Sequence, residues 1–278
     1  MKSIGKRFIH YVKRLYEILC KEELKVLPGH VAYFLFLSII PLISLIGIVA
    51  AKLPVSVEDT ISGLNEMLPK QVVDIIIPVF ETPSFGAGMS LIIGFFLASN
   101  ATSSLIVASN TLYKINKDNY ISRRIKAIFM LIVFIILLLF VLVVMTYGST
   151  LIEFIYNLLF EDHVPKPLIY LFYLLKWTIG VLVMFIMLKI IFTMAPNSNI
   201  PSKTMNRGAI FTTFAWLIAT YLFSIYVTNF SNYNLFYSSL ASIIVFLIWI
   251  YILSISLVVG IAINSEYYFK YQNKKKKV

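Results

Sequence analysis

The chain has 278 residues, of which 59% are hydrophobic and only 13% are charged. A soluble domain carries about 25% charged residues, so this composition excludes an ordinary soluble enzyme and indicates a polytopic membrane protein. The net charge of +11 would suit a nucleic-acid-binding protein, but the positions of the charges give a different explanation below. The single cysteine, Cys20, excludes an intramolecular disulfide and a thiolate metal cluster.

The first segment, residues 1–28, predicts a basic amphipathic helix that lies flat on the membrane. Apolar side chains such as Phe8, Leu15 and Ile18 recur at helical spacing between lysines and arginines. A helix of this kind suits the surface of an anionic leaflet. We therefore expect an interfacial segment that contacts anionic lipid at the cytoplasmic face.

The first membrane span is predicted at residues 31–51, which carry no charge. As a helix this stretch reaches about 32 Å, enough to cross the hydrocarbon layer. Pro41 removes a backbone donor in its middle, so a kink is expected there. His30 stands at the inner mouth of this span. It could handle protons, but a lone interfacial histidine is more often a hydrogen-bonded anchor.

An acidic outer loop follows at residues 52–85. Apolar residues recur at helical spacing in 57–68 and 71–80, and prolines break the pattern. This predicts short amphipathic helices on the outer face, which could act as a lid over the bundle. The second span then runs over about 86–113 and starts at Gly86-Ala-Gly88, a sequence that lacks the spacing of a phosphate-binding loop.

The second span is uncharged yet rich in hydroxyl and amide side chains. On a helical wheel its polar residues fall on two neighbouring lines, Ser99, Ser103, Asn110 and Asn100, Ser104, Thr111. The opposite face is apolar and consists of Leu97, Ala98, Ala101, Leu105, Ala108 and Leu112. Because hydrocarbon offers no hydrogen-bond partners, the polar side should face other helices or a wet cleft. Close helix packing and a polar binding path are both consistent with this pattern.

Two further spans are predicted at 127–150 and 168–194. The first of them is almost purely aliphatic and aromatic, as expected of the most lipid-exposed helix. The second contains the one charge deep in an apolar run, Lys176. That lysine is either a functional cation site or a side chain that snorkels to the outer interface.

The last two spans share an uncharged run that is divided by the turn sequence NFSNYN at residues 229–234. We predict helices at about 208–228 and 236–263. Asn264 and Glu266 then stand at the inner mouth, and residues 269–278 form a basic tail. The predicted fold is therefore all-α, a polytopic bundle of six transmembrane helices at residues 29–268.

The lysines and arginines set the orientation. Twenty of the 24 fall on one side of the predicted membrane and three on the other. The positive-inside rule places both termini in the cytoplasm and makes the protein a multi-pass protein of the cell membrane. This distribution explains the basic charge without a polyanion, so no nucleic-acid partner is expected.

Three segments together resemble the YihY/BrkB family of bacterial inner-membrane proteins. They are HVAYFLFLSIIPLISL at residues 30–45, FFLASNATSSLIVASNTLYKI at 95–115, and the stretch that runs from IIFTMAPN at 190–197 to NSE at 264–266. The resemblance implies six transmembrane helices and a role in envelope integrity without a settled substrate. Members were once labelled ribonuclease BN. This chain has Leu97-Ala98-Ser99 where the family usually has Trp-Ala-Ser, and His30 where it has alanine.

Three functions are weighed on these grounds. The first is transport or handling of a lipid or small solute through the polar cleft of the second span. The second is a structural or assembly role as a homo-oligomer, with the small polar residues of the second and fifth spans at the subunit interface. The third, a tRNA-processing ribonuclease, is the least favoured: the histidines are only His10, His30 and His163, and the acids lack ligand spacing. We expect no enzyme activity, no metal and no cofactor.

Overall fold

The computed structural model describes residues 17–50, 87–116, 119–137, 140, 166–230 and 238–275. Every regular element in this part of the chain is helical. The helices are α2 (Glu22–Ala50), α5 (Ala87–Leu112), a helical segment at 120–137, α7 (Lys166–Met194), the 3-10 helix η1 (Ser202–Met205), α8 (Asn206–Phe230) and α9 (Ser238–Lys275).

The all-helical fold class is confirmed for the described residues. Three stretches within them are long and apolar enough to cross a membrane: Trp177–Met194, Ser202–Tyr226 and Ile244–Asn273. The total of six spans stays a prediction. The predicted outer-loop helices, most of the interfacial segment and the turn at 231–234 lie outside the described residues.

Three helices extend well beyond their predicted spans. The helical segment at 120–137 begins seven residues before the predicted 127, so the second half of the predicted polar loop is helical. Helix α2 begins at Glu22 rather than at residue 31, so it includes the end of the predicted interfacial segment. Just before it, Ile18 is only 1% exposed and packs into the bundle. Helix α9 has 38 residues and therefore a length of about 57 Å, roughly twice the hydrocarbon thickness. It continues through Asn264 and Glu266 into the basic tail.

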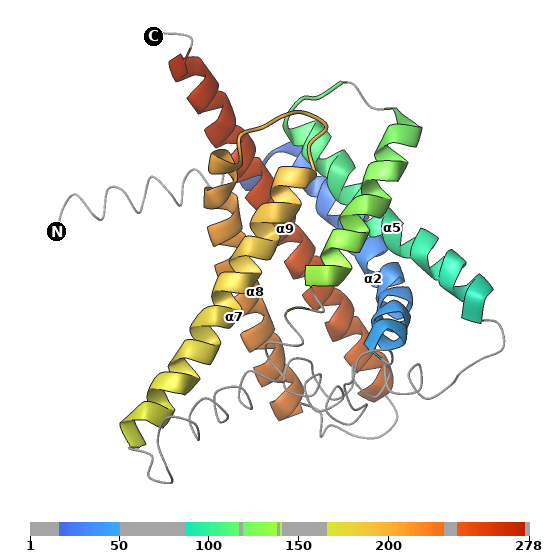
Figure 1. The fold of residues 1–278 in the computed structure, drawn as a ribbon, viewed down its shortest axis with the longest axis vertical. Helices are drawn as coiled ribbons and strands as arrows, with labels where there is room; N and C mark the ends of the chain where they lie inside the picture. The colour runs from blue at the N-terminus through green and yellow to red at the C-terminus, as the bar shows by residue number, and fades with distance from the viewer. Residues whose placement is uncertain are drawn as a thin grey trace.

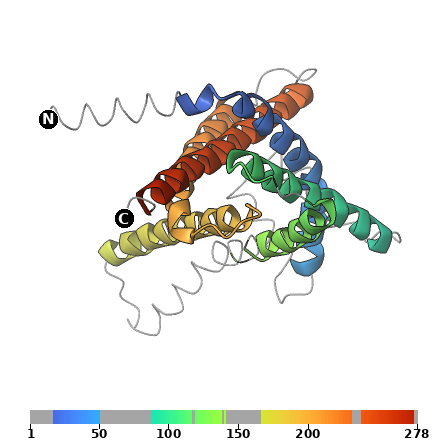
Figure 2. The same cartoon turned by 90° about the horizontal axis from the view of Figure 1, so that it is seen from above.

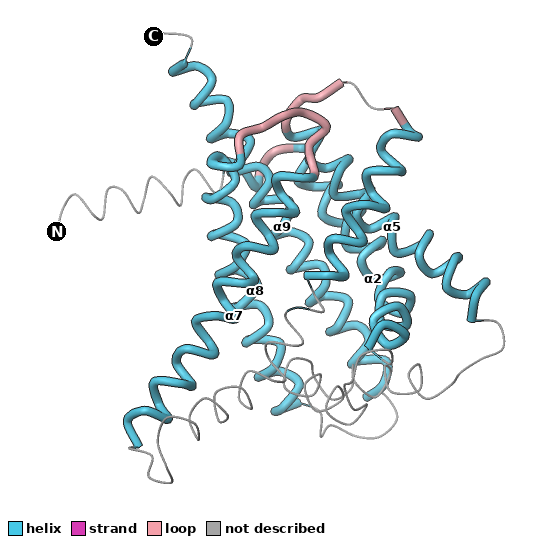
Figure 3. Tube along the Cα trace, in the orientation of Figure 1, coloured by secondary structure: helices cyan, strands magenta, loops and turns pink. Residues whose placement is uncertain are grey.

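The helices meet at one end of the bundle (Figures 1 and 3). The turn after α5, the loop after α7, the start of α2 and the last part of α9 all lie at this end. We call it the basic end, because the cations of these segments gather there: Lys21, Lys114, Arg123, Arg124, Lys126, Lys203, Arg207, Lys270 and Lys275.

Packing is tightest toward the basic end. The main cluster of buried apolar residues takes its members from the ends of α5 and α7 and from the part of α9 beside them: Leu105, Ile106, Ala108, Leu112, Met187, Leu188, Ile191, Phe192, Leu257, Val258 and Ile261. Away from this end the helices diverge. The first residues of α5 and α7 lie on opposite sides of the molecule in both views (Figures 1 and 2).

Helices α8 and α9 approach each other at two glycines. A Cβ atom on Gly208 would overlap the carbonyl oxygen of Gly260, and one on Gly260 would overlap the Oγ1 of Thr212. The short distance lets the backbone N–H of Gly208 donate to the Oδ1 of Asn264 at 2.7 Å. Close backbone packing at small residues is a common way to join helices in a membrane.

Candidate functional site

The predicted polar residues of α5 are divided between the interior and the surface. Ser99, Ser104 and Asn110 are 0%, 1% and 4% exposed, whereas Asn100 and Ser103 are half-buried and Thr111 is exposed. Three of the hydroxyls bond within α5: those of Ser99, Ser104 and Thr111 donate to the carbonyl oxygens of Phe96, Ala101 and Val107 at 2.8, 2.8 and 2.9 Å. Such bonds satisfy a hydroxyl without a neighbouring helix.

The predicted apolar face of α5 is mostly interior as well. Ala98, Ala101 and Ala108 are at most 3% exposed, because α5 packs against both α2 and α9. Apart from Leu97, the residues of α5 that are exposed or half-buried between Phe96 and Thr111 follow one line along the helix: Phe96, Asn100, Ser103, Val107 and Thr111. Each of the two predicted polar lines is therefore divided: Ser99, Ser104 and Asn110 face the protein interior, and the other three polar residues do not.

Asn100 forms a hydrogen bond with Arg124, which lies in the next helical segment, 120–137. Its Oδ1 accepts a hydrogen bond from Nη1 of Arg124 at 2.6 Å, and the carbonyl oxygen of Phe96 accepts one from Nη2 at 2.9 Å. The guanidinium carbon lies 3.7 Å from the centroid of the Phe96 ring. Thr102 fixes the crossing of the two helices, since its Oγ1 donates to the carbonyl oxygen of Ala127 at 2.7 Å.

Asn110 belongs to a second polar cluster, which joins α5, the segment 120–137 and the loop after α7. Its Oδ1 accepts a hydrogen bond from the backbone N–H of Asn197 at 2.8 Å. The Nζ of Lys126 donates to the carbonyl oxygens of Ala195 and Pro196 at 3.2 and 2.6 Å, and to Oδ1 of Asn197 at 2.8 Å. We call Asn110, Lys126 and Asn197 the polar closure.

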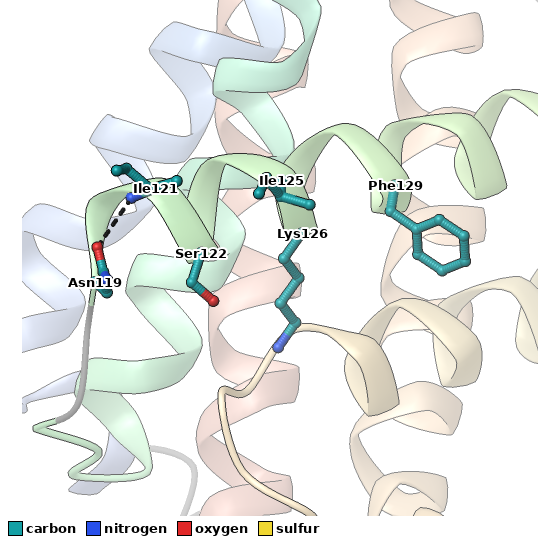
Figure 4. A pocket seen from close by; sticks show the side chains of 6 residues that line it. All are labelled: Asn119, Ile121, Ser122, Ile125, Lys126 and Phe129. Atoms are coloured by element: carbon teal, nitrogen blue, oxygen red, sulfur yellow. Dashed lines mark hydrogen bonds between the residues drawn. The ribbon is translucent and has the colours of Figure 1, made fainter.

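Two open hollows lie beside the polar closure. The larger, of about 540 Å³, is lined by Asn119, Ile121, Ser122, Ile125, Lys126 and Phe129, and Figure 4 shows Lys126 reaching from it toward the loop after α7. The smaller, of about 340 Å³, is lined by Thr193, Ser198, Asn199, Ile200 and Pro201. Neither hollow is lined by α5, so the polar cleft along that helix stays a prediction.

The three residues predicted at the inner mouth occupy different surroundings. Asn264 is fully buried and accepts the Gly208 N–H described above. Glu266 forms an ion pair of 3.0 Å with Lys21 and so ties the start of the described chain to α9. His30 is exposed, and its ring meets the edge of Phe34 with the centroids 5.0 Å apart.

Pro41 and Lys176 lie inside the continuous helices α2 and α7. Their side chains are outside the described residues, so the predicted kink and cation site stay predictions. Among the described histidines, cysteines, aspartates and glutamates, no three side chains gather in a way that could hold a metal ion.

Sequence reasoning missed Arg124, Lys126 and Asn197 as members of polar clusters. The two cations were counted only as loop charges that set the orientation, and Asn197 only as part of a helix stop. Their one sequence signal was the presence of Asn100 and Asn110 in an uncharged helix, since each buried amide requires a partner. Which residues supply the partners depends on how the helices cross.

These features define a polytopic helical membrane protein whose helices are joined by polar contacts at one end. The family model described as "Virulence factor BrkB" matches residues 16–278. The chain therefore belongs to that family, as its three matching segments indicated.

Similar proteins are named either as a ribonuclease-like protein or as UPF0761 membrane proteins. "Putative ribonuclease-like protein YfkH" of Bacillus subtilis is 26% identical over 267 residues, which cover 92% of this chain and 94% of that protein. A UPF0761 membrane protein of Alteromonas mediterranea is 24% identical over 92% of this chain and 87% of its own length. Another from Aeromonas salmonicida is 23% identical over 87% and 83% of the two chains. No solved structure matches this chain.

Proposed function

We propose that the protein handles a lipid or a small solute within the cell membrane and thereby supports the integrity of the envelope, with both termini in the cytoplasm. The observation that carries this proposal is the asymmetry of the bundle. Helices are bonded together at the basic end by the polar closure and diverge from it toward the other end. A bundle that is bonded together at one end only would allow a path that is closed on one side of the membrane, as alternating access requires.

The partly exposed polar residues along one line of helix α5 support the same proposal. Asn100, Ser103 and Thr111 are only partly covered by neighbouring helices, and polar groups that face a path allow a headgroup or solute to pass through the hydrocarbon layer. No aspartate or glutamate lies at mid-depth in the predicted spans. We therefore infer passive or lipid-linked movement rather than proton-driven pumping.

The alternative of a homo-oligomeric structural protein receives less support. It requires the small polar residues of α5 and α8 to meet a neighbouring subunit. Several of them bond inside one protomer instead: Thr212 of α8 donates to the carbonyl oxygen of Ser256 at 3.1 Å, and Thr102 of α5 donates to that of Ala127 at 2.7 Å. Thr213 likewise donates to Ala209 within α8 at 2.8 Å.

We further infer that the chain is not a nuclease, although one relative is named ribonuclease-like. Metal-dependent cleavage of a phosphodiester needs a cluster of histidine and carboxylate ligands, whereas the sequence has only three histidines, His10, His30 and His163, and its acids lack ligand spacing. Incubation of detergent-purified protein with precursor tRNA and a divalent metal tests this inference. Robust cleavage by clean protein would overturn it.

Reconstitution into liposomes tests the proposed function. Flux of fluorescently labelled phospholipids and of small solutes should exceed that of protein-free liposomes. Asn110→Leu should change the flux, because it removes an acceptor of the polar closure, whereas Asn116→Leu on the exposed turn should not. Equal flux with and without protein would refute transport.

The single cysteine allows a separate test of the orientation. Cys20 is exposed and free, so it reports the side of the membrane on which the N-terminal segment lies. A membrane-impermeant maleimide should label it in inverted vesicles but not in intact spheroplasts. Labelling of intact spheroplasts would place the basic end outside.

A further inference from the structure

We propose that Arg124 binds the phosphate of an anionic phospholipid whose acyl chain lies along the exposed apolar side of residues 120–137. The inference rests on the proposed handling of a lipid and adds its chemical class. Neither the composition nor the helical wheel singled out this arginine. The proposal comes from where the structure places its guanidinium.

The guanidinium of Arg124 is held in place by neutral groups only. Its contacts are the amide oxygen of Asn100, the carbonyl oxygen of Phe96 and the ring face of Phe96. Within the described part of the chain, no carboxylate pairs with it. An arginine is always charged in proteins, so this site at the junction of two membrane helices keeps a full positive charge.

Donors remain for an anion. A guanidinium has five N–H groups; one on Nη1 and one on Nη2 are used in the two bonds to α5, and Nε is buried without a partner. The second N–H of each terminal nitrogen is left, and charge-assisted N–H donors suit a phosphate oxygen. Because α5 already fixes the side chain, little conformational entropy is lost when an anion binds.

An apolar surface suited to an acyl chain begins beside this charge. Side chains spaced three and four residues apart share one side of the helical segment and are 42 to 66% exposed: Ile121, Ile125, Phe129, Ile132 and Ile136. Ile121 and Ile125 flank Arg124 in the sequence and line the hollow of about 540 Å³. The five exposed apolar side chains extend from the basic end along the helix. An acyl chain whose headgroup lies at the basic end would run in the same direction.

Charge complementarity identifies the lipid as anionic. The basic end gathers most of the described cations, and the predicted orientation places it at the inner leaflet, where anionic headgroups are abundant. A zwitterionic lipid carries a cation beyond its phosphate, which the surrounding lysines and arginines would repel. We therefore expect selection of phosphatidylglycerol over phosphatidylcholine.

Native mass spectrometry of the full chain in mixed micelles tests the proposal. Wild-type protein should retain phosphatidylglycerol in preference to phosphatidylcholine. Arg124→Gln should weaken phosphatidylglycerol binding about tenfold, the effect of losing one charge-assisted hydrogen-bonding group, while phosphatidylcholine binding stays unchanged. Arg123→Gln removes the same charge one residue away and should weaken binding less than about twofold. Equal effects of the two substitutions, or no effect of either, would overturn the proposal.

Three controls exclude other readings. Arg124→Lys keeps the charge but loses the paired donors, and an intermediate affinity is expected. If Arg124→Gln does not fold, Ile125→Asp on the exposed surface should also lose phosphatidylglycerol, and unchanged binding by that variant would refute the acyl path. Displacement of the lipid by millimolar inorganic phosphate would show a phosphate site rather than a lipid site, and would equally overturn the proposal.

The outcome is independent of the flux assay. Selective retention of phosphatidylglycerol without any flux would preserve the lipid site and refute transport. Flux by wild-type protein, together with identical lipid binding by Arg124→Gln and Arg123→Gln, would preserve transport and refute the lipid site.

Discussion

The contact between α8 and α9 at Gly208 gives the sharpest prediction about the fold. Gly208→Ala adds a methyl group where the structure has the backbone of the facing helix: its Cβ would overlap the carbonyl oxygen of Gly260 and lie 2.5 Å from Nδ2 of Asn264. A backbone carbonyl cannot move aside as a flexible side chain can. The two helices must therefore separate, and the bond from Gly208 N–H to Asn264 weakens with them.

The cost follows from three contributions. Overpacking costs about 1–3 kcal/mol, and an unsatisfied buried amide at Asn264, which is 0% exposed, costs about 1–3 kcal/mol. Alanine recovers up to about 1 kcal/mol of helix propensity relative to glycine. We expect a net loss of about 1–6 kcal/mol. A loss of 3 kcal/mol would lower the midpoint of thermal unfolding by about 6–12 °C for a domain of this size.

Thermal unfolding in detergent, followed by the recovery of monomer in size-exclusion chromatography, measures this effect. Gly29→Ala is the matched control, because it makes the same change within helix α2 where nothing lies within 4 Å of the added Cβ. That variant should be as stable as wild type or slightly more stable. If Gly208→Ala proved as stable as Gly29→Ala, the close α8–α9 packing would be wrong.

Three further predictions concern the basic end. Lys114, just after α5, has a left-handed backbone with φ of 56°, a conformation that glycine adopts more easily than lysine. Lys114→Gly should therefore stabilise the protein by about 0.5–1 kcal/mol in the same thermal assay. A loss of stability would contradict the left-handed turn. Lys126→Met removes three hydrogen bonds to the loop after α7 and should lower the free energy of unfolding by about 2–3 kcal/mol. The exposed Lys203→Met is the control and should lower it little. Equal losses of stability in the two variants would refute the polar closure. The side chains of Lys21 and Glu266 are 39% and 24% exposed. A double-mutant cycle should therefore give a coupling energy of only about 0.2–1 kcal/mol that falls with added salt. A larger coupling energy that does not depend on salt would mean that the pair is buried.

Hydropathy predicted three stretches that the structure shows as helices long and apolar enough to cross a membrane, but it did not predict where all the helices end. The start of α7 at Lys166 and both ends of α8 fall within two residues of the predicted 168 and 208–228. Prolines and charges precede or begin both helices, and the asparagine-rich sequence NFSNYN marks the end of α8. Helix α9 continues to Lys275 instead of ending at 263. Charged residues such as lysine are good helix formers, so the loss of hydropathy marks the end of the hydrocarbon layer and not the end of the helix.

The candidate site was less predictable because it depends on contacts between helices. A wheel shows which residues of α5 share a side, but not which neighbours cover that side. The three alanines of its predicted apolar face are buried because their small side chains let α2 and α9 approach. Arg124 lies 24 residues after Asn100 in the chain, and their contact requires the crossing of α5 with residues 120–137, which the sequence does not encode in any local pattern.

The structure also indicates which contacts a transport cycle would break. Helices α8 and α9 touch through their backbones at Gly208 and Gly260, so separating them would expose buried polar groups and lose close packing. The polar closure includes four side-chain hydrogen bonds made by Lys126 and Asn110. At about 1 kcal/mol each, they total roughly 4 kcal/mol. Binding energy of that size can shift a two-state equilibrium from one side to the other. Under the proposed function, the loop after α7 would therefore part from residues 120–137, while α8 and α9 move as one unit.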